Sequence, residues 1–256
     1  MDMVQKSHIN IIVYEESQVL INLKTIGLVG GMSWESTLEY YKIINDTVKA
    51  KLAKLGGLHS AQSMMYSVDF EEIEVLQHKN KWEKLTDIMV DASQKLKNGG
   101  ADFIVICTNT IHKMANDIQE RTGMKVLHIA EATGKKVIEK GIKKVGLLGT
   151  KFTMEQDFYK KILEEHFNVN VIIPDESDRK IIHKVIYGKL CKGIIDEVSK
   201  MKYIKIINKL ALNGAEGIIL GCTEIPLLIK QEDISIPIFD TTKIHAVSAV
   251  EFALKR

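Results

Sequence analysis

The stretch Gly217-Ile-Ile-Leu-Gly-Cys-Thr-Glu-Ile-Pro-Leu-Leu228 places a cysteine, a threonine and a glutamate directly after a short apolar run. Residues 217–220 have the composition of a strand that is buried on both faces, which is typical of a parallel sheet. In open parallel sheets, ligands bind beyond the carboxyl ends of the strands. The polar residues that follow this strand are therefore candidates for a functional site.

The rest of the chain alternates short β-branched runs with longer stretches of helical periodicity. Strands are expected at residues 25–29, 61–68, 103–106, 125–129, 144–148, 170–173, 217–220 and 236–239. Helices are expected at residues 36–52, 81–98, 111–121, 155–166, 177–189 and 202–213. This alternation predicts an α/β fold with parallel sheets of the doubly wound kind.

An internal repeat divides the chain into two similar α/β halves. Three pairs of segments occur in the same order: Lys24-Thr-Ile-Gly-Leu-Val-Gly-Gly-Met-Ser33 with Lys143-Lys-Val-Gly-Leu-Leu-Gly-Thr-Lys-Phe152, Gly100-Ala-Asp-Phe-Ile-Val-Ile-Cys-Thr108 with Gly214-Ala-Glu-Gly-Ile-Ile-Leu-Gly-Cys222, and Lys125-Val-Leu-His-Ile129 with Pro237-Ile-Phe-Asp-Thr241. We assign residues 24–122 plus 232–256 to a first domain and residues 123–231 to a second. Residues 1–23 are interpreted as an N-terminal extension with a possible short edge strand at 9–14.

Composition excludes several classes of protein. The 256 residues carry 35 basic and 33 acidic side chains, a net charge of +2, which gives no electrostatic case for a nucleic-acid or membrane partner. Three cysteines indicate reduced thiols in a cytoplasmic protein. No apolar run approaches the ~20 residues of a membrane span, and the first 22 residues do not fit a signal peptide.

The two repeated strand ends carry groups suited to proton transfer. Residues 103–106 lead into Cys107-Thr-Asn-Thr110, and residues 217–220 lead into Gly221-Cys-Thr-Glu224. A thiol at the start of a helix is expected to have a pKa below about 8.5. Two such strand ends facing one cleft would place a proton-transfer group on each side of a small anion, as a racemase requires.

These motifs resemble the cofactor-independent aspartate/glutamate racemase family. The resemblance rests on residues 25–37, 107–110, 149–159 and 221–224 and extends from about Lys24 to the C-terminus. It implies two similar domains with parallel sheets related by a pseudo-twofold axis and an active site between them. It also implies racemisation of aspartate or glutamate without pyridoxal phosphate or another cofactor, in a protein that is often a homodimer.

The first strand end departs from the Cys-Asn-Thr of most family members, because this chain has Cys107-Thr-Asn-Thr110. Aligned without gaps, the repeat sets Thr108 opposite Cys222 and Cys107 opposite Gly221. Since side chains alternate in direction along a strand, Cys107 should point elsewhere. The asymmetric pair resembles an L-specific aspartate/glutamate racemase subgroup. We expect Cys222 to remove the α-proton and the Thr108 side to return one, with Cys107 in reserve.

Further site residues follow from the same resemblance. The expected substrate-binding residues are Met32, Gln77, Asn109, Thr110, Thr153, Thr223 and Glu224. The glutamate at 224 is typical of the aspartate racemase branch. No H-x-x-x-H or Cys-x-x-Cys cluster occurs, so no metal is expected. Cys191 is interpreted as a packing residue. Lys189 and Lys192 are interpreted as solvated, although a basic side chain in this segment could bind the distal carboxylate of the substrate.

Two alternatives remain open at this point. The wider superfamily includes maleate isomerases, hydantoin racemases and arylmalonate decarboxylases, which also use strand-end cysteines. An amino-acid-binding regulator with residual activity is the non-enzymatic alternative, and the missing second thiol is the feature that supports it.

Overall fold

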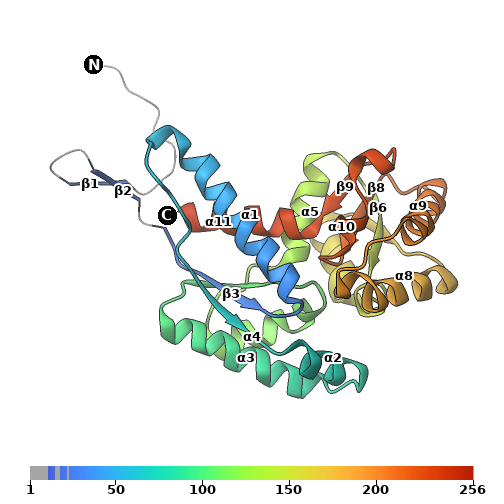
Figure 1. Cartoon of the computed structure of the whole chain (residues 1–256), viewed down its shortest axis with the longest axis horizontal. Helices are drawn as coiled ribbons and strands as arrows, with labels where there is room; N and C mark the ends of the chain where they lie inside the picture. The colour runs from blue at the N-terminus through green and yellow to red at the C-terminus, as the bar shows by residue number, and fades with distance from the viewer. Residues whose placement is uncertain (1–10, 15–17, 22, 256) are drawn as a thin grey trace.

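The computed structural model describes residues 11–14, 18–21 and 23–255. Residues 23–255 form two parallel sheets covered by helices (Figure 1). The first sheet has the order β4 (Ser63–Ser67), β3 (Ile26–Gly30), β5 (Phe103–Ile106). The second has the order β7 (Asn170–Ile172), β6 (Lys144–Gly149), β8 (Gly217–Gly221), β9 (Ile238–Asp240). The expected α/β fold with parallel sheets is confirmed.

Helices cover both faces of each sheet. They are α1 (Trp34–Leu52), α2 (Phe70–His78), α3 (Trp82–Gly99), α4 (Ala115–Thr122), α5 (Ile129–Glu139), α6 (Lys151–Glu155), α7 (Asp157–Lys161), α8 (Glu176–Gly188), α9 (Glu197–Leu212), α10 (Ile225–Leu228) and α11 (Thr241–Leu254). Short 3-10 turns include η2 (Thr110–Met114) and η4 (Leu190–Lys192). Several helices begin at a side-chain cap, among them Ser33 before α1 and Asp240 before α11. Among the described helices, none combines the length and the apolar character needed to span a bilayer.

Equivalent strands of the two sheets pair in the same register. Ile26 of β3 pairs with Phe103 of β5, and Val145 of β6 pairs with Gly217 of β8. The sequence repeat aligns these same positions. Likewise Ile104 bridges Val126, as its counterpart Ile218 pairs with Ile238. The halves are therefore equivalent in backbone hydrogen bonding as well as in sequence.

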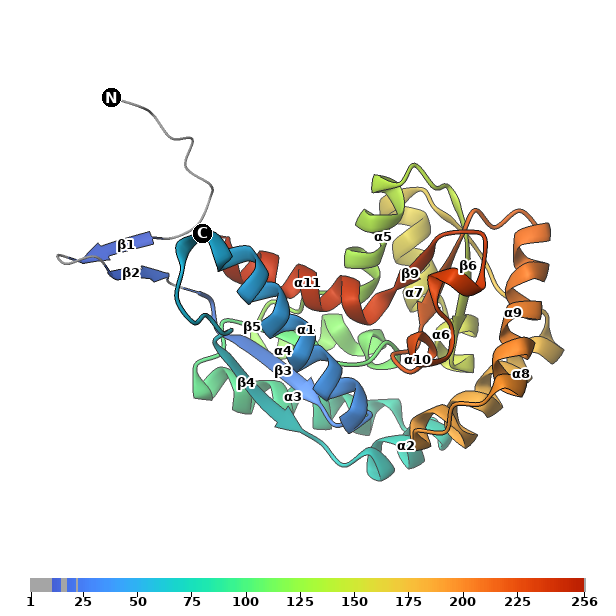
Figure 2. The ribbon, with the colours of Figure 1, turned by 45° about the horizontal axis from the view of Figure 1, so that its top comes forward.

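The last helix of each half packs against the sheet of the other half. After the Val126 bridge in the first sheet, the chain enters α5, which packs in the core of the second sheet through Ile129 and Val137. After β9 in the second sheet, the chain enters α11, which packs against α1 and the first sheet through Ala246 and Val250. Figure 2 shows α11 running from β9 to α1. This exchange fastens the two domains together.

The exchange moves the expected domain boundaries. Residues 232–240 were assigned to the first domain, but β9 pairs with β8 in the second sheet. Val126 was assigned to the second domain, but it bridges Ile104 of the first sheet. The chain crosses between the sheets at His128 and Asp240, the N-caps of α5 and α11. In each case the chain first pairs with a strand of its own sheet and only then passes to the other sheet. The boundaries assigned from the sequence therefore lie several residues too early.

Other local expectations also differ from the structure. The strand expected at 125–129 is reduced to the bridge at Val126, because His128 already caps α5. The helix expected at 155–166 is broken where Gln156 adopts an extended conformation between α6 and α7. In the described part of the extension, Ile11–Tyr14 (β1) pairs with Gln18–Ile21 (β2) in an antiparallel sheet of their own, not at the edge of a main sheet.

The equivalence of the halves predicts equal sensitivity to core truncation. Ile104 and Ile218 are both fully buried, so Ile104→Ala and Ile218→Ala should each lower the free energy of unfolding by about 2–5 kcal/mol. The control is Leu212→Ala, at a side chain 89% exposed, with an expected change within about 0.5 kcal/mol. Urea unfolding measures all three. Either core variant matching the control would contradict the packing described.

Candidate active site

The ends of β3, β5, β6 and β8 meet around one small cavity between the two sheets. Its volume is about 30 Å³, which is room for about two water-sized groups. The lining residues are Met32, Phe70, Gln77, Thr108, Asn109, Thr110, Thr150, Ile186, Tyr187, Cys191, Gly221, Cys222 and Glu224. Seven of the nine site residues expected from the sequence therefore line a single pocket. The other two, Thr153 and Thr223, contact residues of its wall.

At the end of β5, Thr108 faces the cavity and Cys107 does not. Cys107 is fully buried in the core beneath α1 and α11, and its backbone N–H donates to Val29 O at 2.9 Å. Burial raises the pKa of the Cys107 thiol far above its ordinary range. The ungapped register of the repeat thus describes the backbone correctly, and Thr108 rather than Cys107 shares the pocket with Cys222.

At the end of β8, the carboxylate of Glu224 gathers three hydrogen bonds. Ser33 Oγ donates to Oε1 at 2.9 Å, while Cys222 Sγ and Thr223 Oγ1 each donate to Oε2 at 2.9 Å. Ser33 belongs to the first half, so this contact crosses between the domains. Glu224 is 4% exposed, and its three donors replace the water that a buried carboxylate loses.

The pKa of Cys222 shifts in the direction opposite to that expected. Burial raises it well above its ordinary value, and the neighbouring charge of Glu224 raises it further. The expectation of a lowered pKa relied on a helix start, but α10 has only four residues and a carboxylate stands at its N-cap. The thiol therefore holds its proton and donates it to Glu224.

A cluster of threonine hydroxyls joins the ends of β5 and β6. Thr110 Oγ1 lies 3.2 Å from Thr150 Oγ1 and 3.4 Å from Thr153 Oγ1, across the domain boundary. Thr150 also caps α6, accepting from the Thr153 N–H at 3.3 Å. Nearby, Asn109 Nδ2 donates to Thr241 Oγ1 at 3.1 Å, and its buried Oδ1 has no partner among the described residues. The cluster offers hydroxyl donors, and Asn109 offers one acceptor.

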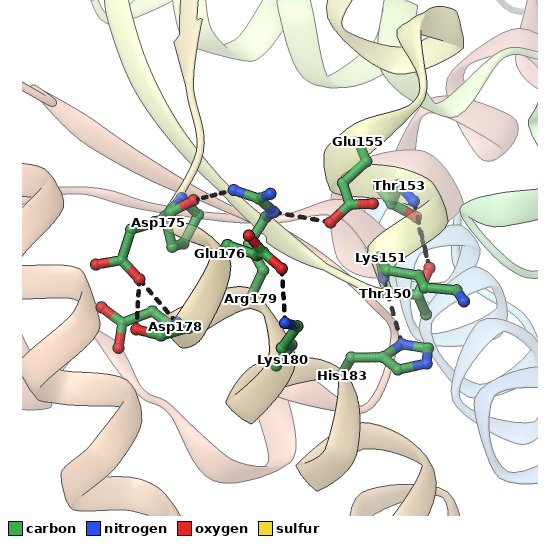
Figure 3. A network of polar contacts seen from close by, with 12 residues as sticks. Thr150, Lys151, Thr153, Glu155, Asp175, Glu176, Asp178, Arg179, Lys180 and His183 are labelled. Carbon is green, nitrogen blue, oxygen red and sulfur yellow. Dashed lines mark hydrogen bonds and ion pairs between the residues drawn. The ribbon is translucent and has the colours of Figure 1, made fainter.

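A polar network holds the β6–α6 turn in place (Figure 3). Arg179 of α8 donates from Nε to Glu155 Oε1 at 2.8 Å and from Nη1 to Pro174 O at 2.7 Å. Beside it, the Lys151 N–H donates to His183 Nδ1 at 3.3 Å. These contacts fix α6 against α8 and thereby fix Thr150 and Thr153 at the cavity.

Tyr187 and Cys191 line the cavity together with Gln77 of α2, and the sequence did not reveal their place there. Tyr187 of α8 donates to Gln77 Oε1 at 3.4 Å, and burial raises the pKa of its hydroxyl, so it stays neutral. Cys191, expected to be a packing residue, lines the cavity with Cys222. Helical periodicity places Tyr187 and Cys191 on elements of the second half but cannot show that they meet α2. Among the described residues, no cluster of three His, Cys, Asp or Glu is arranged to hold a metal ion.

A cluster of three buried histidines supports the Thr108 turn from behind. His112 Nδ1 donates to Thr108 O at 2.8 Å, and the ring of His112 lies 4.8 Å from that of His128 and 5.2 Å from that of His245. His245 Nε2 donates to Leu127 O at 2.7 Å, so its Nδ1 accepts from Tyr40 at 2.8 Å. Burial lowers the pKa of His128 to about 4 and that of His245 to about 3. Burial also lowers the pKa of His112, so all three rings are neutral at pH 7.

Removal of the Glu224 charge is expected to lower the pKa of Cys222, although burial would still keep it high. In Glu224→Gln, the pH midpoint for alkylation of Cys222 by iodoacetamide should move downward, as resolved by peptide mass spectrometry. Glu74→Gln is the control, because the Glu74 carboxylate faces His78 Nε2 at 3.6 Å rather than the Cys222 thiol. An unchanged or higher midpoint in Glu224→Gln would contradict the electrostatic coupling.

The histidine cluster predicts loss of stability in acid. The unfolded chain binds protons at these histidines below pH ~6.5, whereas the folded chain binds them only near the lowered pKa values of about 4 and 3. Each such histidine should therefore cost about 1.4 kcal/mol of unfolding free energy per pH unit below 6.5. Urea unfolding between pH 7.5 and 5 measures the slope. His245→Gln should flatten it; equal slopes in the wild type and in this variant would refute the account.

Comparison with known proteins agrees with this geometry. A family model described as Asp/Glu/Hydantoin racemase matches residues 29–249. A Yersinia pestis structure described as a "putative Asp/Glu Racemase" is 51% identical, with a TM-score of 0.84, over 91% of this chain and 100% of its own. An aspartate racemase homologue from Pyrococcus horikoshii OT3 is 34% identical, with a TM-score of 0.77, over 90% of this chain and 99% of its own.

A further relative extends the comparison. The broad specificity amino-acid racemase RacX of Bacillus subtilis (strain 168) is 24% identical over 234 residues, which cover 88% of this chain and 96% of RacX. The residues matched by the family model, 29–249, include the ends of β5 and β8 that line the pocket. The chain therefore belongs to the Asp/Glu/hydantoin racemase family and, like its homologues, is an isomerase of the amino-acid racemase type.

Proposed function

We propose that the protein racemises a free amino acid at its α-carbon, with Cys222 on one face of the substrate and Thr108 on the other. The observation that carries this proposal is that both side chains line the same cavity, each at the end of an equivalent strand. The motif resemblance favours aspartate or glutamate as the substrate, and the family description agrees with it. Neither pyridoxal phosphate nor another cofactor is part of the proposal.

Glu224 prepares Cys222 for proton abstraction. Its Oε2 lies 2.9 Å from Cys222 Sγ and can take the thiol proton, leaving a thiolate. A substrate ammonium group beside Glu224 would favour that thiolate, because an opposite charge stabilises the ionised form. The thiolate then removes the α-proton from the face that it touches. Substrate binding and activation of the nucleophile are thereby coupled.

Thr108 acts on the opposite face. A threonine hydroxyl is too weak an acid to be a ready base, but it can donate its proton to the carbanion or hold a water that does so. The donor regains a proton from solvent, and the Cys222–Glu224 pair releases one to solvent, so that the site returns to its starting state. His112 fixes the Thr108 carbonyl and hence the direction of the side chain. Because the two enantiomers are equal in free energy, the overall forward and reverse efficiencies must still match. The asymmetry therefore slows the reaction without making it one-way.

The remaining polar groups hold the substrate. The hydroxyls of Thr110 and Thr150 supply donors for the α-carboxylate, and these donors stabilise negative charge that develops as the α-proton leaves. The free Oδ1 of Asn109 and the carboxylate of Glu224 supply acceptors for the ammonium group. The cavity of about 30 Å³ is smaller than an amino acid, so entry requires the domains to move apart. The Ser33–Glu224 and Tyr187–Gln77 hydrogen bonds are contacts that must open.

Loss of the α-proton in heavy water tests the proposal. Proton NMR of both enantiomers should show exchange by the wild type and a loss of about 10²–10⁴-fold in Cys222→Ser, because a positioned base is removed. Cys107→Ala is the matched control, since this strand-end cysteine lies in the core and should leave exchange within a few-fold. Thr108→Cys should raise the racemisation rate by supplying a second thiol.

Two outcomes would count against this scheme. Full exchange activity in Cys222→Ser would remove Cys222 from the chemistry. Equal and fast exchange from both enantiomers in the wild type would contradict an asymmetric thiol and hydroxyl pair, even if racemisation itself occurred.

A further inference from the structure

We propose that Ser33 of the first domain positions the Glu224 carboxylate beside the Cys222 thiol, and that it does so only while the two domains are closed. Ser33 is a positioning residue that acts through Glu224, since it is not among the described residues that line the cavity. The inference rests on the proposed racemase function, in which Glu224 takes the proton of Cys222. It adds a residue of the other domain to that step.

The direction of the Ser33–Glu224 hydrogen bond is fixed by the other contact of the hydroxyl. Ser33 is the N-cap of α1, and its Oγ accepts from the Ser36 N–H at 3.3 Å. Its single hydroxyl proton is therefore available to Glu224 Oε1, at 2.9 Å, because an ionised carboxylate can only accept. Ser33 is 2% exposed, so bulk water does not compete for this proton.

The first turn of α1 holds Ser33 in place. Its carbonyl oxygen accepts from the Thr37 N–H at 3.3 Å and from Thr37 Oγ1 at 2.8 Å. Thr37 Oγ1 in turn accepts from the Gly31 N–H at 2.9 Å, which ties the helix to the turn after β3. A donor that is anchored in this way imposes its position on the side chain of Glu224, which on its own has many rotamers.

The two oxygens of the Glu224 carboxylate have partners in different domains. Oε1 accepts from Ser33, whereas Oε2 accepts from Cys222 Sγ and Thr223 Oγ1, each at 2.9 Å. Of these three donors, Ser33 alone comes from the first domain. Its hold on Oε1 fixes the plane of the carboxylate and directs Oε2 at the thiol. Loss of the Ser33 hydroxyl leaves a buried oxygen without its donor, and the carboxylate is then free to turn away.

This contact exists only when the domains are together. Ser33 begins α1 beside the first sheet, and Glu224 follows β8 of the second sheet. Because the cavity of about 30 Å³ is smaller than an amino acid, substrate entry moves the domains apart and separates Ser33 Oγ from Glu224 Oε1. Closure on the substrate restores the bond. Activation of the thiol is thereby confined to the closed site, from which water is excluded.

Exchange of the α-proton of aspartate and glutamate, followed by NMR in heavy water on the full chain, tests this role. Ser33→Ala should lower kcat by about 10- to 100-fold, the effect of one hydrogen bond to a charged group, and should change KM much less. Ser33→Thr retains both the hydroxyl and the helix cap and should keep kcat within a few-fold of the wild type. An unchanged kcat in Ser33→Ala would overturn the inference alone, whereas absence of exchange in the wild type would refute the racemase function.

A double-mutant cycle with Glu224→Ala distinguishes positioning of Glu224 from a general structural effect. If Ser33 acts through Glu224, Ser33→Ala should lower the residual exchange of Glu224→Ala by no more than about 2-fold. A loss of 10-fold or more in both backgrounds would show that Ser33 acts independently of Glu224, and the inference would be wrong.

Alkylation by iodoacetamide reports on closure separately from turnover. Cys222 is 8% exposed, so the reagent reaches it from the opened site. Ser33→Ala removes a contact that holds the domains together and should raise the alkylation rate of Cys222 several-fold while exchange falls. Cys107, which is fully buried beneath α1 and α11, should stay as slow as in the wild type; peptide mass spectrometry resolves the two cysteines.

The matched control removes a helix cap elsewhere. Asp175→Ala deletes the N-cap of α8, whose partner is the Asp178 N–H at 2.9 Å, and should leave both exchange and alkylation of Cys222 within a few-fold. Equal acceleration at Cys107 and Cys222 in Ser33→Ala would indicate general loosening of the fold and contradict a specific role. An unchanged or slower alkylation of Cys222 would contradict the link to closure.

Discussion

The register of β5 and β8 decides which side chain at each strand end reaches the pocket. Both strands pair with their central neighbours at equivalent positions, and the repeat then places Thr108 where the other half has Cys222. A shift of one residue would turn Cys107 into the cavity and Thr108 into the core. The exchanged helices α5 and α11 hold the two sheets so that these strand ends face each other.

The buried carboxylate of Glu224 determines the electrostatic environment of the cavity. Its hydrogen bonds reach Ser33 in one half and Cys222 in the other, so one carboxylate contacts both halves beside the thiol. The same carboxylate raises the pKa of Cys222 and that of Cys191. An ammonium group beside Glu224 would complement the charge of this carboxylate.

Much of this arrangement could be predicted from local patterns. Strand ends carrying Cys, Thr and Glu are visible in the sequence, and the spacing of the repeat fixed the choice of Thr108 over Cys107. The sign of the Cys222 shift could not be predicted, because it depends on burial and on a hydrogen bond formed only in the folded chain. Tyr187 and Cys191 were missed because they meet the α2 side of the pocket only through tertiary packing, which brings together segments far apart in the sequence.

The geometry of a bound ligand is the most direct measure of the central claim. A crystal structure of the protein with a slowly reacting amino acid should show the α-carbon between Cys222 Sγ and Thr108 Oγ1. Each of these two atoms should lie about 3–3.5 Å from the α-carbon. The two groups should lie on opposite faces of that carbon. A ligand seated elsewhere, or one whose α-carbon meets only one of the two side chains, would contradict the account.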